Sequence, residues 1–247
     1  MAAEPKRGSI HPISSLIREA NNIFVQMGFT FAEGPLIEDE WHNFDALNVP
    51  KDHPARDMQD TFFIKGEAGM VLRTHTSNVQ IRYMEDRIKK GIAPPYRMVT
   101  MGKVFRNEAT DMVHEAEFFQ MEGLVVGPDI TLAHLKGTLE QFFAKLFGGA
   151  SVEVRFRPSF FPFVEPGVEV DMRLVGESVP EKLRGKWIEM MGAGMVHPAV
   201  LKNAGVDPKA YRGFAFGMGL DRLALLRWGI DDVRHMHSAD LRFVNQF

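Results

Sequence analysis

The chain carries a series of short segments with the residue pattern of β-strands, and this series constrains the fold more than any other feature of the sequence. The segments lie at residues 97–105, 118–126, 152–157, 168–174 and 187–191. In the third segment, VEVRFR, apolar and polar residues alternate with the period of two expected for a strand with one buried face. Consecutive strands without an intervening helix pair antiparallel, whereas a doubly wound parallel sheet alternates strands with helices. The sequence therefore predicts an α+β fold built on a mainly antiparallel sheet.

Helices are expected on either side of these strands. Apolar residues recur at three- and four-residue spacing over residues 11–28 and 131–147, and helical character also fits residues 77–90. No repeat, low-complexity tract or long linker divides the chain. We therefore expect a single domain over residues 10–247, preceded by a flexible lead at residues 1–9.

The composition excludes several classes of protein and site. With 45% hydrophobic and 25% charged residues, the chain resembles neither disordered nor collagen-like proteins. It has no apolar run long enough to cross a membrane, and without cysteine it has no disulfide, thiolate nucleophile or cysteine-ligated metal. These absences favour a cytoplasmic location.

The net charge of −3 argues against a domain that grips nucleic acid by itself, because such domains usually carry a basic excess. The small basic cluster at residues 87–90 precedes Gly91 and is explained by the end of a helix, where basic side chains complement the dipole. An RNA contact is the alternative for this cluster. If RNA is a substrate, we expect its main grip to lie on another chain.

A first candidate site surrounds Arg106 and Glu108. Neither the lysine-containing phosphate-binding loop nor the dinucleotide-binding glycine motif occurs in the sequence. Alternation along a strand would place Arg106 and Glu108 on one face, where a guanidinium fork can bind phosphate and a carboxylate can accept from an amino group. Residues 108–115 then form a hairpin loop, and Phe118 opens the returning strand, where it could stack on a base. A surface ion pair beside a core phenylalanine is the alternative.

A second candidate site is the glycine-rich block at residues 213–222, GFAFGMGLDR. Small and aromatic residues alternate along a strand that passes through glycines into a helix, and such glycines allow a ligand to approach the backbone closely. Arg222 falls in the first turn of this helix, near its free N–H groups, and this position favours the binding of an anion. A tight strand-to-helix joint is the alternative, but it does not account for Arg222.

These two blocks, together with the helix that ends at Gly34-Pro35, resemble the three sequence motifs of class II aminoacyl-tRNA synthetases. Further blocks are similar to the α subunits of bacterial phenylalanyl-tRNA synthetases, in order from about residue 10 to the end. They are HP at 11–12, NFDALN at 43–48, HPARD at 53–57, RTHTS at 73–77, FPFVEPG at 161–167, GMVHP at 194–198 and GFAFG at 213–217.

The resemblance implies an antiparallel sheet flanked by helices and a reaction in which ATP activates phenylalanine for transfer to tRNA(Phe). It implies that Arg106 binds the α-phosphate and Arg222 the terminal phosphates of ATP. Glu108 and His114 would border the nucleotide, and Phe118 would stack on adenine. Catalysis would then come from positioning and charge neutralisation by the two arginines rather than from a protein nucleophile.

The resemblance also implies a phenylalanine pocket. Its polar residues, which would hold the ammonium and carboxylate groups, are His75, Ser77, Gln120 and Glu122. A glutamate suits this place because a partly buried cation needs a counter-charge. Phe161 and Phe163 would meet the substrate ring edge-to-face, and Ala215 would form the floor. Ordinary core packing is the alternative for the two phenylalanines.

The resemblance also implies a metal site, an assembly with other subunits and an editing function on a partner. Glu165 would contribute to a Mg²⁺ site at the contact with a β subunit, with a surface glutamate as the alternative. An α2β2 assembly is expected, with residues 11–35 in the contact between α subunits. Editing against tyrosine would belong to the β subunit.

The sequence departs from the family pattern in three places. Asp221 stands where the motif usually has glutamate, and Met236-His237 replaces an aromatic pair. The N-terminal coiled-coil arm of the family is missing, so we expect a catalytic core without it. Two other functions stay open: an amino-acid-binding regulator without catalysis, and an adenylating enzyme with an acceptor other than tRNA.

Overall fold

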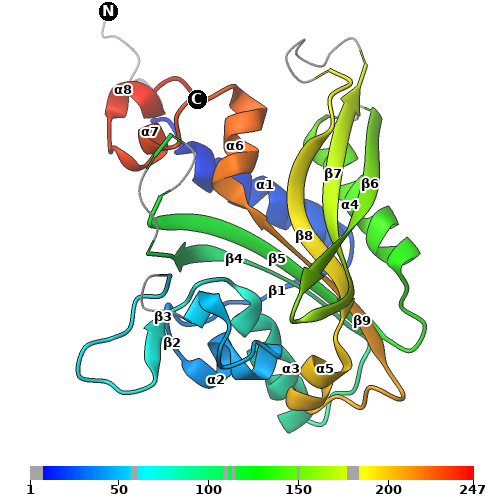
Figure 1. Cartoon of the computed structure of the whole chain (residues 1–247). Coiled ribbons are helices and arrows are strands. Elements are labelled where there is room, and N and C mark those ends of the chain that lie inside the picture. Colours follow the sequence, from blue (N-terminus) through cyan, green and yellow to red (C-terminus); the bar gives the residue numbers. More distant parts are fainter. Residues whose placement is uncertain (1–7, 57–59, 108–110, 113–114, 149–150, 177–183) are drawn as a thin grey trace, which may run out of the picture.

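The fold is built on one large twisted sheet (Figure 1). The computed structural model describes residues 8–56, 60–107, 111–112, 115–148, 151–176 and 184–247. The sheet has seven strands in the order β1-β4-β5-β9-β8-β7-β6, and every neighbouring pair is antiparallel except β1 with β4. The expected α+β fold with a mainly antiparallel sheet is confirmed. The strands are β1 Thr30–Phe31, β4 Tyr96–Phe105, β5 Glu117–Gly127, β6 Ser151–Phe161, β7 Val164–Val175, β8 Ile188–Val196 and β9 Arg212–Gly219.

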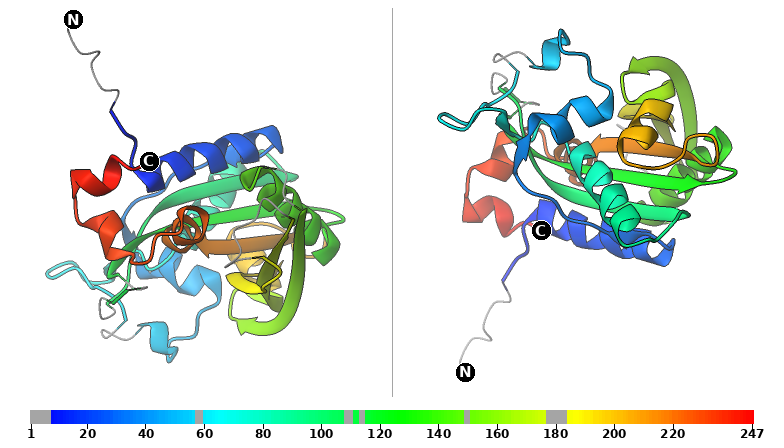
Figure 2. Two further views of the ribbon diagram at one scale, coloured as in Figure 1. Left: turned by 90° about the horizontal axis from the view of Figure 1, so that it is seen from above. Right: turned by 90° about the horizontal axis from the view of Figure 1, so that it is seen from below.

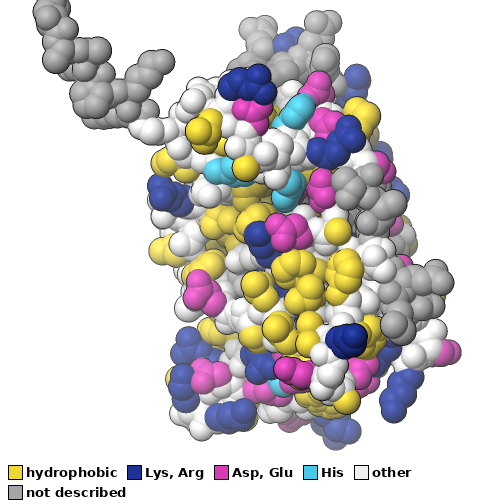
Figure 3. Space-filling view, turned by 90° about the vertical axis from the view of Figure 1, so that its left-hand side faces the viewer, with side chains coloured by type: hydrophobic (Ala, Val, Ile, Leu, Met, Phe, Trp, Pro, Cys, Tyr) yellow, Lys and Arg dark blue, Asp and Glu magenta, His cyan; other side chains and the backbone are white. Residues whose placement is uncertain are grey.

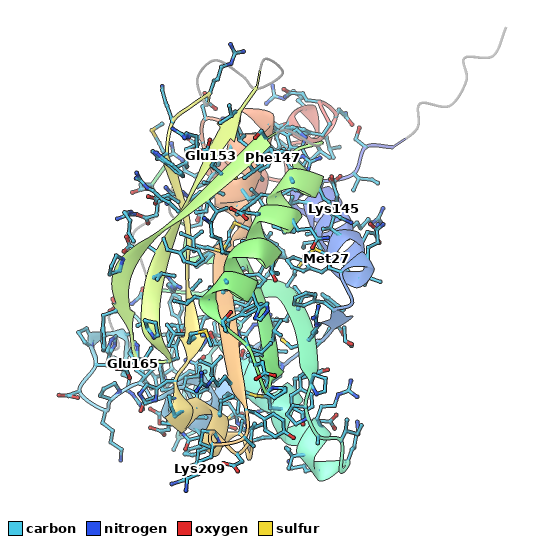
Figure 4. All side chains as sticks on the ribbon, turned by 90° about the vertical axis from the view of Figure 1, so that its right-hand side faces the viewer. Met27, Lys145, Phe147, Glu153, Glu165 and Lys209 are labelled. Atoms are coloured by element: carbon cyan, nitrogen blue, oxygen red, sulfur yellow. The ribbon has the colours of Figure 1, made fainter. Side chains whose placement is uncertain are left out.

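In the described part of the fold, one face of the sheet is covered by three helices. They are α1 Pro12–Gln26, α4 Leu132–Leu146 and α6 Leu220–Trp228. Their apolar stripes meet in a core where the ring of Phe24 stacks on Phe142, with centroids 4.6 Å apart, and on Phe216 of β9 at 5.8 Å. The end of α1 lies beside the end of α4, where Lys145 donates to the Gln26 side chain (Figure 4).

The opposite face carries a layer of short elements, as the views along the sheet show (Figure 2). A second core lies here, made by α3 and the segment around Phe44 packed on β4 and β5. The elements are β2 Ile37–Asp39, α2 Glu40–Asn43, η1 Asp45–Leu47, η2 Pro54–Arg56, β3 Met70–Leu72, α3 Ser77–Lys89 and α5 Pro198–Asn203. Strands β2 and β3 form a separate two-stranded sheet.

The expected elements are present with shifted ends. The predicted helices correspond to α1, α3 and α4, and the predicted strands correspond to β4 to β8. The strand expected at residues 187–191 continues to Val196 because β8 keeps pairing with β7 as far as that residue and pairs with β9 over residues 192–195. The lead expected at residues 1–9 lies mostly outside the described residues. Among the described residues, no helix is long and apolar enough to cross a membrane.

The C-terminal helices, α7 Arg234–His237 and α8 Leu241–Val244, are tied to the start of the fold. His11 caps α1 by accepting from the Ile13 amide, and its other ring nitrogen donates to the carbonyl of Met236 at 2.9 Å. Met236 itself is buried. Of the Met236-His237 pair, Met236 therefore packs in the core, and His237 forms a hydrogen bond with Asp221.

Candidate active site

A cavity of about 470 Å³ lies between the sheet and the layer of short elements. Its walls come from β5, β8 and β9, from the β6–β7 hairpin, and from segments around residues 47–60 and 74–80. The cavity brings together all seven residues of the expected phenylalanine pocket. From that set it is lined by His75, Ser77, Gln120, Glu122, Phe161, Phe163 and Ala215, together with Arg106.

Strand register gives the cavity its floor. Gln120 and Glu122 share one face of β5, and β9 places Gly219 and Gly217 directly opposite them. A Cβ at Gly217 would lie 3.0 Å from Cγ of Glu122, so only glycine leaves the carboxylate its place. On β8, a Cβ at Gly192 would lie 2.8 Å from the ring of Phe161. The glycines therefore create the space that the cavity occupies.

Glu122 is the most buried charged group of this site. Its side chain accepts from the hydroxyl of Ser77 and the amide of Gln80, both at 2.7 Å, and from the backbone N–H of Thr76 at 3.2 Å. Within the described part of the chain, no lysine or arginine forms an ion pair with it. Burial raises the pKa of Glu122, and the three hydrogen bonds oppose that rise. A buried carboxylate without an ion-pair partner favours the binding of a cation.

Gln120 supplies an unused acceptor beside the carboxylate of Glu122. Its Oε1 atom is buried, and among the described residues it has no hydrogen-bond partner. Buried acceptors are normally satisfied, so a free one that lines a cavity indicates a donor on a ligand. A primary ammonium group fits both residues, because it carries a positive charge and three N–H donors.

His75 is held in one neutral tautomer by the backbone. Its Nε2 donates to the carbonyl of Asn43 at 2.9 Å, and its Nδ1 accepts from the amide of Ser77 at 3.2 Å. Burial lowers the pKa of His75 to about 4, and the positive charge of Arg106 acts in the same direction. Because both of its ring nitrogens form hydrogen bonds, His75 orients Ser77 and forms part of the cavity wall. The direct polar contact with substrate that the resemblance implies would require one of these bonds to break.

The low pKa of His75 predicts acid sensitivity. The unfolded chain takes up a proton on this histidine near pH 6.5, whereas the folded chain does so only near pH 4, so stability is lost as the pH falls through that window. Between pH 7 and pH 5 the loss from this group is about 2 kcal/mol. In the His75→Asn protein the side-chain oxygen of asparagine can still accept from the amide of Ser77. Its free energy of unfolding, measured in urea, should fall less between pH 7 and pH 5 than that of the unmodified chain. Equal losses in both proteins would contradict this prediction.

The other end of the cavity is apolar. Phe161 ends β6 and Phe163 lies in the β6–β7 turn, with ring centroids 5.9 Å apart and planes inclined by 20°. Ala215 lies opposite Gly194 on β8 and Leu124 on β5, where a small side chain keeps the floor low. The cavity thus has a polar end that contains a buried carboxylate and an apolar end that contains two aromatic rings.

Arg106 lies between the cavity and Phe118. It follows the last residue of β4, so strand alternation does not orient it; instead its Nε donates to the carbonyl of Thr74 at 3.1 Å. Its guanidinium lies over the ring of Phe118, 5.1 Å from the centroid. A base could stack only on ring surface that Arg106 leaves open. Glu108 and His114, the other expected nucleotide contacts, lie outside the described residues.

Arg222 projects from the first turn of α6 and is exposed. The described residues give it no hydrogen bond or ion pair. Its neighbour Asp221 is buried, accepts from the amide of Phe119 at 2.7 Å and from His237 at 2.8 Å, and raises the pKa of that histidine. Aspartate therefore reaches the backbone of β5 despite its shorter side chain, and it fixes the turn that presents Arg222.

Glu165 alone does not form a metal site. It lies at the lower end of strands β6 and β7 (Figure 4), its side chain is 75% exposed, and its ion-pair partner is His197 at 3.3 Å. Within the described ranges, the one group of side chains with metal-ligand spacing is Glu38, Asp39 and His42. Arg82 already forms an ion pair with Glu38 there. Any Mg²⁺ at Glu165 needs ligands from elsewhere.

Sequence reasoning missed several residues of the cavity. Gln80 donates to Glu122 from inside α3, where helical periodicity marks it only as a buried position. Asp60 adds a carboxylate to the lining and, through its carbonyl, accepts from the amide of Asn107. No local signal marked Asp60, although Gln80 stands three residues after the RTHTS block.

The chain is similar to known proteins over nearly its whole length. The family model described as "tRNA synthetases class II core domain (F)" matches residues 1–247. The chain is 51% identical over 245 residues to the phenylalanine–tRNA ligase alpha subunit of Geobacillus thermodenitrificans, a match that covers 98% of this chain and 70% of that protein. It is 49% identical over 243 residues to the proteins of the same name from Clostridium kluyveri and Bacillus cytotoxicus, covering 97% of this chain and 69% of each of them.

Proposed function

The chain belongs to the class II tRNA synthetase family, among the phenylalanine–tRNA ligase alpha subunits, and from this premise we propose that it activates phenylalanine with ATP and transfers it to tRNA(Phe). One observation carries the substrate assignment. The buried carboxylate of Glu122 and the free Oε1 of Gln120 lie in a cavity that also contains the rings of Phe161 and Phe163. A single amino acid with an aromatic side chain satisfies both parts.

The proposed reaction needs no protein nucleophile. A carboxylate oxygen of phenylalanine attacks the α-phosphorus of ATP, the bond to the β-phosphate oxygen breaks, and pyrophosphate leaves. Arg106 would hold the α-phosphate, and Arg222 would hold the phosphates that depart. Fixed positive charges at these points lower the barrier because they are already in place when negative charge develops. Phe118, Glu108 and His114 would border the nucleotide, and magnesium would arrive with ATP.

Specificity for phenylalanine would rest on the apolar end of the cavity. Ala215 and the two phenylalanines offer no partner to the hydroxyl of tyrosine. Such a pocket rejects an added hydroxyl by only about a hundredfold. Further discrimination would require editing by a β subunit, in the cytoplasm where we place this reaction.

A surface suited to partners accompanies the site. On the face shown in Figure 3, hydrophobic side chains gather across the middle of the molecule. Beside and within residues 11–35, Ile10, Val25 and Leu36 are 46%, 54% and 44% exposed. Large exposed apolar patches mark interaction surfaces. We propose a β-subunit partner, an α2β2 assembly with residues 11–35 in the contact between α subunits, and a Mg²⁺ at Glu165 completed by the partner.

The test of function is ATP–pyrophosphate exchange by the purified chain with phenylalanine, with tyrosine and with no amino acid. We expect exchange that depends on phenylalanine and falls about a hundredfold with tyrosine. If the folded chain is inactive alone, the assay is repeated with the β subunit. Inactivity in both conditions, with phenylalanine still bound, would favour a regulator instead. Exchange without transfer to tRNA(Phe) would favour a different acceptor.

A further inference from the structure

Arg73 is a buried arginine to which the proposed reaction assigns no role. It is 3% exposed, and in the described part of the chain it forms no ion pair. Its Nε donates to the carbonyl of Lys103 at 2.7 Å, and its Nη1 donates to the carbonyls of Gly34 and Pro35 at 3.2 and 3.4 Å. A buried charge held only by main-chain carbonyls is costly. Packing alone does not account for it.

The sheet makes room for this guanidinium. Gly102 on β4 lies directly under it, and a Cβ at that position would overlap with Nη2 of Arg73. Gly102 pairs with Gln120 across β4 and β5, so Arg73 covers the strand next to the polar end of the cavity. Burial lowers the pKa of Arg73, and the negative charges of Glu122 and Glu38 oppose that shift. Its charge therefore acts close to the carboxylate that would hold the ammonium group.

The backbone that follows Arg73 contacts both halves of the site. Arg73 is fixed by main-chain bonds from its N–H to Leu36 and from Phe105 to its carbonyl, both at 2.9 Å. One residue later, the carbonyl of Thr74 accepts from Nε of Arg106. Two residues beyond that, the N–H of Thr76 donates to Glu122. A shift of this segment would move the phosphate-binding guanidinium and the ammonium-binding carboxylate together.

We propose that Arg73 is a positioning residue that fixes segment 73–77 against β4 and thereby sets Arg106 and Glu122 at the spacing that adenylate formation requires. The inference rests on the proposed function. It assigns to Arg73 no contact with substrate. Its side chain joins the Gly34-Pro35 turn, β4 and segment 73–77, so the guanidinium fork is needed rather than its charge alone.

The experiment compares Arg73→Lys, Gly102→Ala and the control Gly137→Ala in pyrophosphate exchange, with the β subunit present if the chain requires it. A Cβ at Gly137 of α4 meets no atom within 4 Å, so the control adds the same methyl group at an open position. Arg73→Lys keeps the charge but loses the fork, and Gly102→Ala displaces the fork without removing it. We expect both to lower kcat/KM for phenylalanine and for ATP by about 10- to 100-fold, because small misplacements of reacting groups cost that much. Gly137→Ala should match the unmodified chain.

A double-mutant cycle separates positioning from a general loss of stability. Arg106→Lys removes the Nε–H that reaches Thr74, so its cost should be clearly smaller in the Arg73→Lys background than in the unmodified chain. Additive costs, or losses that merely follow the folded fraction measured by circular dichroism, would overturn the inference. Unchanged kcat/KM in both Arg73→Lys and Gly102→Ala would overturn it as well. Absence of exchange in the unmodified chain would instead overturn the proposed function, and this inference with it.

Discussion

Replacing Glu122 with glutamine is expected to abolish phenylalanine activation and at the same time to stabilise the unliganded chain. The carboxylate is buried, burial raises its pKa, and it has no ion-pair partner among the described residues, so its charge destabilises the empty site. Glutamine keeps the shape, and the side chains of Ser77 and Gln80 can turn to satisfy its amide. We expect the free energy of unfolding at pH 7 to rise by about 1 kcal/mol or more.

The loss of activity should far exceed this gain in stability. Removing one partner of a buried charge pair costs about 2–5 kcal/mol, which corresponds to a loss in kcat/KM of about 30- to 5,000-fold. Pyrophosphate exchange measures the activity, and urea unfolding without substrate measures the stability. Glu140→Gln, on the remote helix α4, is the matched control and should change neither. A normal KM for phenylalanine in the Glu122→Gln protein would show that Glu122 does not bind the substrate.

The family resemblance implied the residues of the polar end of the cavity, and strand geometry by itself groups only two of them. A period of two places Gln120 and Glu122 on one face, and no distant part of the chain is needed to see it. The floor was less visible. Gly217 faces Glu122, and Gly192 lies under the ring of Phe161. Both placements depend on the register between strands that are far apart in sequence. Local pattern does not contain that information.

The orientations of His75 and Arg106 could not be predicted from the sequence, because backbone groups distant in sequence hold their side chains. His75 has both nitrogens engaged only because the carbonyl of Asn43 lies beside it in the fold. Arg106 was expected on a strand face, yet it lies past the strand end and is oriented by Thr74. The parallel pairing of β1 with β4 was hidden for a related reason, since the described part of β1 has only two residues and no detectable periodicity. Helices α1, α3 and α4, by contrast, carry their own signal.

Arg222→Ala is expected to abolish pyrophosphate exchange while leaving phenylalanine binding nearly intact. Arg222 is exposed at the start of α6, has no partner among the described residues, and follows an aspartate that fixes the turn. The chain therefore loses little stability when the side chain is removed. If Arg222 holds the departing phosphates, its removal raises the barrier by an amount typical of a single electrostatic contact, about a thousandfold in rate.

Two assays distinguish this effect from damage to the amino-acid pocket. Isothermal titration should give phenylalanine affinities within about twofold for Arg222→Ala and the unmodified chain, whereas exchange rates should differ by about a thousandfold. Arg212→Ala removes an exposed arginine from the opposite end of β9 and should behave like the unmodified chain in both assays. Normal exchange by Arg222→Ala would exclude this arginine from phosphate binding. Loss of phenylalanine binding would show instead that α6 helps to shape the cavity, because the guanidinium lies outside its lining.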